Sequence, residues 1–178
     1  MLHQQIDPRS LWRLIVVGAI ALSLASCQTQ PLSSEPSSPP AADSTATPAD
    51  STFAEVIAVE ATAGEPGAYT FAVTVQSPDT GCDQYANWWE VVSEAGELIF
   101  RRPLAHSHVE EQPFRRAGGA VAVQPDQTVI VRAHMYPTGY GSQAMQGSVD
   151  AGFIAVELPP EFAAELAQQG RQPAGCEF

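Results

Sequence analysis

Residues 85–104 read YANWWEVVSEAGELIFRRPL, and this stretch decides the fold. Two runs rich in aromatic and β-branched residues flank the tetrapeptide Glu94-Ala95-Gly96-Glu97. Gly96 can adopt the positive φ that a tight hairpin turn requires. The pattern therefore predicts an antiparallel β-hairpin with strands over residues 85–93 and 98–104.

Further strands are expected on both sides of this hairpin. Between residues 69 and 76, large apolar residues alternate with small or polar ones, and a period of two is typical of a half-buried strand. By similar criteria, strands are predicted over residues 55–60, 69–76, 120–123, 128–136 and 153–158. Turns or loops are predicted over 64–67, at Gly118-Gly119 and over 137–148, and a short helix over 161–169.

About seven short strands separated by turns predict an all-β fold. We expect an immunoglobulin- or fibronectin-like β-sandwich with a short C-terminal helix. Trp88 and Trp89 are adjacent, so on one strand they face opposite sides of the sheet. One of them belongs in the core. The other is either part of an exposed aromatic binding surface or covered by the C-terminal segment.

The N-terminal segment carries a targeting pattern. Arg9 and Arg13 precede an apolar run over residues 14–25, shorter than the roughly 20 residues of a spanning helix. The run ends in Leu24-Ala25-Ser26-Cys27, which resembles the lipobox of bacterial lipoproteins. The resemblance implies a signal peptide over residues 1–26 and stable membrane anchoring through acyl chains, such as palmitate, on Cys27. The alternative is a short anchor that is never cleaved.

Composition divides the remaining chain into three parts. Residues 27–52 are dominated by Ser, Pro, Thr and Ala and show no hydrophobic periodicity, which predicts a disordered linker. Residues 53–158 form the predicted sandwich, and residues 159–178 form the predicted helical tail.

The charge balance restricts the partners. The formal net charge is −12, and residues 1–26 carry a net +1, so the remainder is at −13. This balance argues against binding to nucleic acid and against electrostatic attraction to anionic lipid headgroups. The chain has no lysine, and five arginines lie between residues 101 and 132, near several glutamates. They predict surface ion pairs between strands, with an arginine pocket for an anionic ligand as the alternative.

If Cys27 carries lipid, Cys82 and Cys176 remain as a pair. In an exported protein such a pair is most simply a disulfide, which would tie the C-terminal tail back to the strand that starts near Tyr85. Closing a loop of about 95 residues would stabilise the fold by roughly 4–5 kcal/mol in the chain-entropy model. The alternative is two free thiols that could bind metal.

Residues 106–116 read HSHVEEQPFRR. Together with residues 85–92 and Gly139-Tyr140-Gly141, they make residues 68–147 resemble an uncharacterised family of exported bacterial β-sandwich proteins with the pattern HxHVxEQPFxR. That family commonly has Pro where this chain has Ser107. The resemblance implies a fold and a candidate site but no activity. The candidate ligand- or partner-binding residues are His106, His108, Glu110, Gln112, Arg115 and Arg116.

A metal site is an alternative use of this segment. His106 and His108 would share one face of an extended strand, about 7 Å apart. Two imidazoles can bind Zn²⁺ or Cu²⁺ if a third ligand joins them. That ligand would be His134, Glu110 or Glu111, with Met135 or Met145 available for copper. Without metal, one of the two histidines would pack in the core and bond to a carboxylate.

Catalytic patterns are weak in this sequence. Ser107 has no glycine-rich nucleophile turn beside it, and the Gly139-Tyr140-Gly141 loop is not followed by a predicted helix that could hold phosphate. We therefore expect a lipid-anchored protein of the bacterial cell envelope, facing the periplasm or exterior, that binds another envelope protein or a small ligand and is not an enzyme. The alternatives are a periplasmic Zn or Cu protein using His106, His108 and His134, and an unrecognised hydrolase.

Overall fold

The computed structural model describes residues 52–177 of the 178-residue chain. The predicted signal peptide, Cys27 and all but the last residue of the predicted linker lie outside these residues. The described elements are β1 (Glu55–Ala63), β2 (Tyr69–Gln76), β3 (Tyr85–Ser93), β4 (Leu98–Pro103), β5 (Phe114–Val121), β6 (Val129–Tyr136), β7 (Gly139–Tyr140), β8 (Gln143–Ser148), β9 (Gly152–Glu157) and the 3-10 helix η1 (Ala164–Gln168). Within residues 52–177, no helix is both long and apolar enough to span a membrane.

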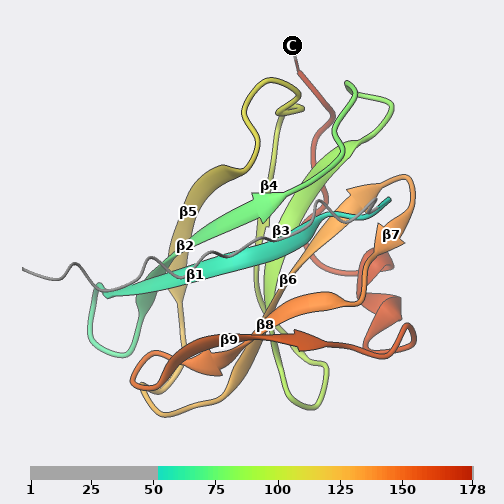
Figure 1. Ribbon diagram of the computed structural model, residues 1–178. Helices are drawn as coiled ribbons and strands as arrows, with labels where there is room; N and C mark the ends of the chain where they lie inside the picture. Colours follow the sequence, from blue (N-terminus) through green and yellow to red (C-terminus); the bar gives the residue numbers. More distant parts are fainter. Residues whose placement is uncertain (1–51, 178) are drawn as a thin grey trace, which may run out of the picture. The chain divides into compact units, whose positions relative to one another are not determined.

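The strands form two antiparallel sheets that pack as a sandwich (Figure 1). The smaller sheet has the order β1-β2-β5, and the larger has the order β4-β3-β6-β8-β9, with β7 paired to β6. Inward-facing side chains of both sheets, including Phe71, Trp89 and Phe114, make the main core. The predicted all-β sandwich is confirmed.

The hairpin of residues 85–104 is confirmed as β3 and β4. Trp89 pairs with Arg102 and Glu90 with Arg101 across the two strands, and Gly96 in the turn has φ 84°. The other edge of β3 pairs with β6, so β3 is an inner strand of the larger sheet and β4 forms the edge of that sheet.

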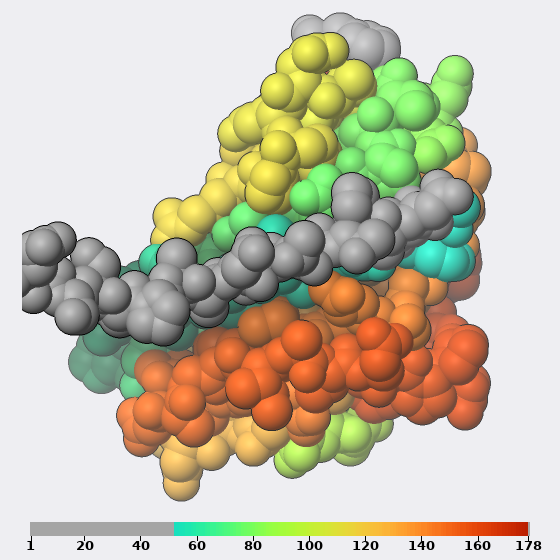
Figure 2. Space-filling model, in the orientation of Figure 1, coloured from blue at the N-terminus to red at the C-terminus, as the bar shows by residue number. Residues whose placement is uncertain are grey.

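The two sides of the sandwich differ in how they are closed. On one side β1 lies against β8 and β9, as Figure 2 shows for the cyan and orange segments. On the other side β4 and β5 are the edge strands of their sheets. There the C-terminal tail passes close to both strands. Arg171 of the tail lines a cavity together with Phe100 of β4 and Gly118 of β5.

Two loop predictions are wrong. Gly118 and Gly119 do not form a turn but lie inside β5. A Cβ on Gly118 would come within 3.0 Å of the Trp89 ring and 3.1 Å of Phe100, so the glycine is needed for close packing. The predicted loop 137–148 contains β7 and β8. At Gly147 the strand passes so close to the Gly152 carbonyl that a side chain would not fit.

The C-terminal segment packs on the outer face of the larger sheet. The helix predicted over 161–169 is the shorter 3-10 helix η1, and its Leu166 joins Val92, Ile130 and Ala144 in a second, smaller core. The Cys82–Cys176 disulfide is confirmed, with 5.4 Å between the Cα atoms. Trp88 and Trp89 are both buried, so neither tryptophan contributes an exposed aromatic surface.

Candidate functional site

The histidine motif lies in the loop that connects β4 to β5, which we call the histidine loop (residues 104–113). The expectation of an extended strand is wrong here, because these residues belong to no strand. The chain nevertheless brings the two imidazoles together, with 4.6 Å between the ring centres of His106 and His108.

A buried carboxylate that sequence reasoning missed fixes this loop. Asp79 follows β2, and its Oδ1 accepts hydrogen bonds from the Ser77 hydroxyl at 2.7 Å and the Ala86 amide at 2.9 Å. Its Oδ2 accepts a bond from the His108 amide at 2.8 Å. Residues 77–81 read SPDTG, a composition typical of a turn, but nothing local indicates that this segment contacts the histidine loop.

Gln112 also holds the loop in place. Its Nε2 donates to the His108 carbonyl at 3.0 Å and to the Ser77 hydroxyl at 3.1 Å, while its Oε1 accepts a bond from the Ser77 amide at 3.0 Å. The side chain is therefore engaged with the protein. Of the six candidates, Gln112 is a positioning residue.

The His108 side chain is almost fully buried but makes no polar contact through its ring. The ring stacks on Phe114 at 3.8 Å with an interplanar angle of 11°. Neither Nδ1 nor Nε2 has a hydrogen-bond partner among residues 52–177. Nδ1 lies 3.9 Å from Asp79 Oδ2, which is close enough for an ion pair if the ring is protonated but too far for a hydrogen bond.

Burial and nearby positive charge favour the neutral form of this ring. Burial is the main cause that lowers the pKa of His108 below its usual value, and the positive charge of Arg116 adds to it. The nearby Asp79 and Glu111 oppose these effects without cancelling them. A neutral imidazole has one N–H donor and one acceptor, so His108 retains both functions without a partner.

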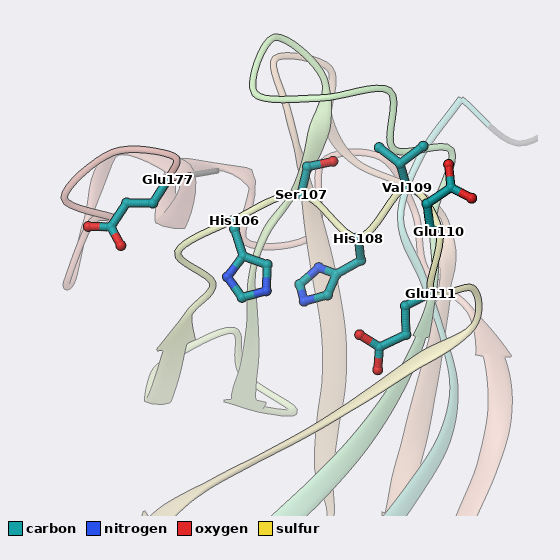
Figure 3. Close-up of a pocket in the computed structure, with 7 residues that line it drawn as sticks. All are labelled: His106, Ser107, His108, Val109, Glu110, Glu111 and Glu177. Atoms are coloured by element: carbon teal, nitrogen blue, oxygen red, sulfur yellow. The ribbon is translucent and has the colours of Figure 1, made fainter.

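The two histidines line an open pocket of about 310 Å³. Figure 3 shows both imidazoles on one side of the loop, with the Glu111 carboxylate beside His108, whereas Ser107, Val109 and Glu110 project from the other side. Glu177 from the disulfide-bonded tail completes the lining, and its amide donates to the Ala105 carbonyl. The sequence carried no direct signal for Glu177.

The two candidate arginines point to different places. Arg116 donates to Glu111 at 2.7 Å, and this bond lowers the pKa of Glu111. Arg115 pairs instead with Glu60 of β1 at 2.8 Å, and both of these side chains are exposed. The structure thus brings His106, His108 and Glu110 to one pocket, places Arg116 beside it and leaves Arg115 outside.

The structure does not bring His134 to this pair. His134 lies within β6, stacked on Trp88 at 3.8 Å, and its Nδ1 is 2.7 Å from Asn87 Oδ1. Burial, with Arg101 and Arg132, lowers the pKa of His134 to about 3. Among residues 52–177, no group of three or more His, Cys, Asp or Glu is placed to hold a metal ion.

A second polar cluster lies on the outer face of the larger sheet. Glu90 is fully buried and accepts bonds from Arg101 at 2.6 and 2.8 Å and from Arg132 at 2.9 Å. We call Glu90, Arg101 and Arg132 the arginine cluster. The expected surface ion pairs exist for Arg115 and Arg116. Arg101 and Arg132 are instead buried, because the C-terminal segment covers them.

Comparison with known proteins gives one informative match. Over 107 residues the chain is 36% identical to a protein of Halomicrobium mukohataei described as "Putative lipoprotein". The match covers 60% of this chain and 48% of the relative, so the chain spans about half the length of that protein. No protein-family model matches the chain, and no solved structure matches it either. The description supports a lipoprotein and names no ligand, substrate or partner.

Proposed function

We propose that this protein is a lipid-anchored, non-catalytic binding module of the cell envelope and that the pocket of the histidine loop is its ligand site. The lipobox-like Leu24-Ala25-Ser26-Cys27 and the similarity to a protein described as a lipoprotein support the anchor. The Cys82–Cys176 disulfide supports export, because such bonds persist in oxidising compartments.

The observation that carries the binding site is the state of His108. A buried polar group without a partner costs about 1–3 kcal/mol. His108 has two such nitrogens, although Asp79 and Gln112 hold the backbone around it firmly. Both nitrogens have almost no exposed surface, so the ring must shift toward the adjoining pocket before a ligand can bond to it and offset this cost.

The surroundings of the pocket favour a ligand that donates hydrogen bonds and carries positive charge. Glu110, Glu111 and Glu177 all border it, although Glu110 projects from the far side of the loop, and within residues 52–177 only Glu111 of the three pairs with an arginine. The neutral ring of His108 can accept a hydrogen bond from an ammonium group. A volume of about 310 Å³ admits a small amine or one basic side chain of a partner protein.

The geometry gives less support to a hydrolase. A serine nucleophile needs a base within hydrogen-bond reach. The Ser107 hydroxyl is buried and has no hydrogen-bond partner among the described residues, and Figure 3 shows it pointing away from both imidazoles. The proposal is therefore for recognition.

Thermal unfolding of the detergent-solubilised full chain tests the site. We would add primary amines, amino sugars and short basic peptides to the wild type, to His108→Phe and to Arg115→Gln as the matched control. At least one compound should raise the Tm of wild type and Arg115→Gln by about 3 °C or more, but not that of His108→Phe. The absence of any shift, or equal shifts in all three proteins, would contradict the proposal.

The anchor is tested separately by cell fractionation. The wild-type chain should remain with the membrane fraction and incorporate labelled palmitate, whereas Cys27→Ser should do neither. Recovery of both proteins in the same fraction, or no labelling of the wild type, would refute lipidation at Cys27.

A further inference from the structure

The outer face of the larger sheet holds a positively charged site beneath the C-terminal segment. Arg101 and Arg132 both bond to Glu90, so one carboxylate faces two guanidinium groups and the arginine cluster carries a net charge of +1. The three side chains are 3% exposed or less. Buried charges require compensation by opposite charge or by hydrogen bonds.

The C-terminal segment supplies that compensation through backbone dipoles alone. Arg132 donates to the carbonyls of Phe162 at 2.6 Å and Ala163 at 2.9 Å. Arg101 donates to the carbonyls of Leu166, at 2.6 Å, and Gln169. Four neutral oxygens thus occupy positions where the oxygens of an anion would also satisfy the guanidinium donors.

The sheet itself holds the guanidinium groups in place. Arg101 lies over the Trp88 ring at 4.4 Å, and Arg132 lies over the Tyr140 ring at 3.6 Å. With the bonds to Glu90, these contacts fix both arginines through residues of β3, β4, β6 and β7. The donors would therefore keep their arrangement if the tail moved away.

The tail that covers the cluster buries few of its own side chains. Between residues 159 and 177 only Leu166 is buried. Ala163 is held at φ 45°, a conformation that is unfavourable for a residue with a side chain, and η1 has no side-chain cap. Segments with little buried apolar surface open at low free-energy cost. The disulfide between Cys176 and Cys82 ties the end of the C-terminal segment covalently to the rest of the domain.

From these contacts we infer that the arginine cluster is an oxyanion-binding site that the C-terminal segment occupies in the oxidised protein, and that reduction of Cys82–Cys176 opens it. In the reduction, a dithiol reductant transfers two electrons and two protons to the disulfide. Two cysteine thiols form, and the reductant becomes a disulfide. The freed tail can then be displaced by a carboxylate or phosphate group, which neutralises the net positive charge.

Titration calorimetry on the detergent-solubilised full chain at low salt tests this site, with inorganic phosphate and succinate as separate probes that distinguish the two oxyanion classes. The reduced wild type and Cys82→Ser/Cys176→Ser should bind at least one probe about tenfold or more tightly than the oxidised wild type. In the Ser/Ser background, Arg132→Gln should lose this binding and Arg115→Gln should keep it. If Arg132→Gln does not fold, Arg132→Lys replaces it, because it retains the charge but not the forked donors.

Hydrogen exchange gives an independent measurement. Amides of residues 162–169 should exchange at least about tenfold faster after reduction and slow again when the bound probe is added. Equal affinity of the oxidised and reduced proteins, binding that survives the loss of Arg132, or no binding by either opened form would overturn the inference. Unchanged exchange in residues 162–169 after reduction would overturn it as well.

Discussion

His108 in the histidine loop and the arginine cluster both place polar side chains in buried positions, but the polar atoms are paired in one case and unpaired in the other. In the arginine cluster, Glu90 and the guanidinium groups of Arg101 and Arg132 bond to one another and to four tail carbonyls. In the histidine loop, the backbone is firmly bonded while the His108 ring has no polar partner among the described residues. While the tail is in place, the paired network stabilises the fold, whereas the unpaired His108 ring lies beside a pocket and gains a partner only when a ligand binds there.

Loss of Glu90 should produce the largest effect on stability. Glu90→Gln leaves two buried guanidinium groups facing each other without a carboxylate, and breaking a buried ion pair in this way costs about 3–5 kcal/mol. Urea unfolding should show this loss as a lower transition midpoint with little change in slope. The matched control is Glu60→Gln, which removes an exposed pair with Arg115 and should cost less than about 1 kcal/mol. Similar costs for both variants would break the contrast.

Acidification should reveal the buried neutral histidines. The pKa of His134 in the folded protein is about 3, below the usual value of about 6.5, and that of His108 is also lowered. The unfolded chain therefore binds more protons below pH 6.5, and the free energy of unfolding falls as the pH falls through this window.

For His134 alone the loss should be about 2 kcal/mol between pH 7 and pH 5. Urea unfolding at several pH values measures it, and imidazole NMR should show His134 still neutral at pH 5. In His134→Gln the pH dependence over this range should be weaker. A His134 ring that protonates near pH 6 would show that burial does not control its charge.

The smallest expected effect is that of His108→Phe. The substitution keeps the stacking on Phe114 and removes two ring nitrogens that have no partner among the described residues. Replacing unsatisfied polar atoms with apolar ones of similar shape is nearly neutral or stabilising. We therefore expect a change within about 0.5 kcal/mol in urea unfolding. A loss of several kcal/mol would mean that the imidazole has a structural role, and the contrast with Glu90 would disappear.

Part of the fold followed from local pattern. The alternation in residues 69–76 and the turn at Gly96 predicted β2 and the β3–β4 hairpin, because both signals depend on neighbours along the chain. The strand through Gly118 and Gly119 was missed, since glycine usually marks a turn. Glycine occupies position 118 because the Trp89 ring on the opposite sheet leaves no space for a side chain.

The candidate site, like the fold, was predicted only in part from the sequence. The spacing of His106 and His108 indicated a site, and the structure places both rings at one pocket. The sequence did not indicate that Asp79 anchors the loop or that Glu177 borders it, because these residues are 29 and 69 positions from His108. It also grouped Arg115 with Arg116, although adjacent residues on a strand point to opposite faces.

By itself, the sequence determined the class of fold and the cysteine pair, because strand periodicity, turn residues and cysteine count are properties of local composition. Only the tertiary structure decided which polar groups are paired. It placed the C-terminal segment over Arg101 and Arg132, stacked His134 on Trp88 away from the other histidines, and left His108 buried without a polar partner among the described residues. Pairing depends on which atoms meet across strands, and no local pattern in the chain specifies that meeting.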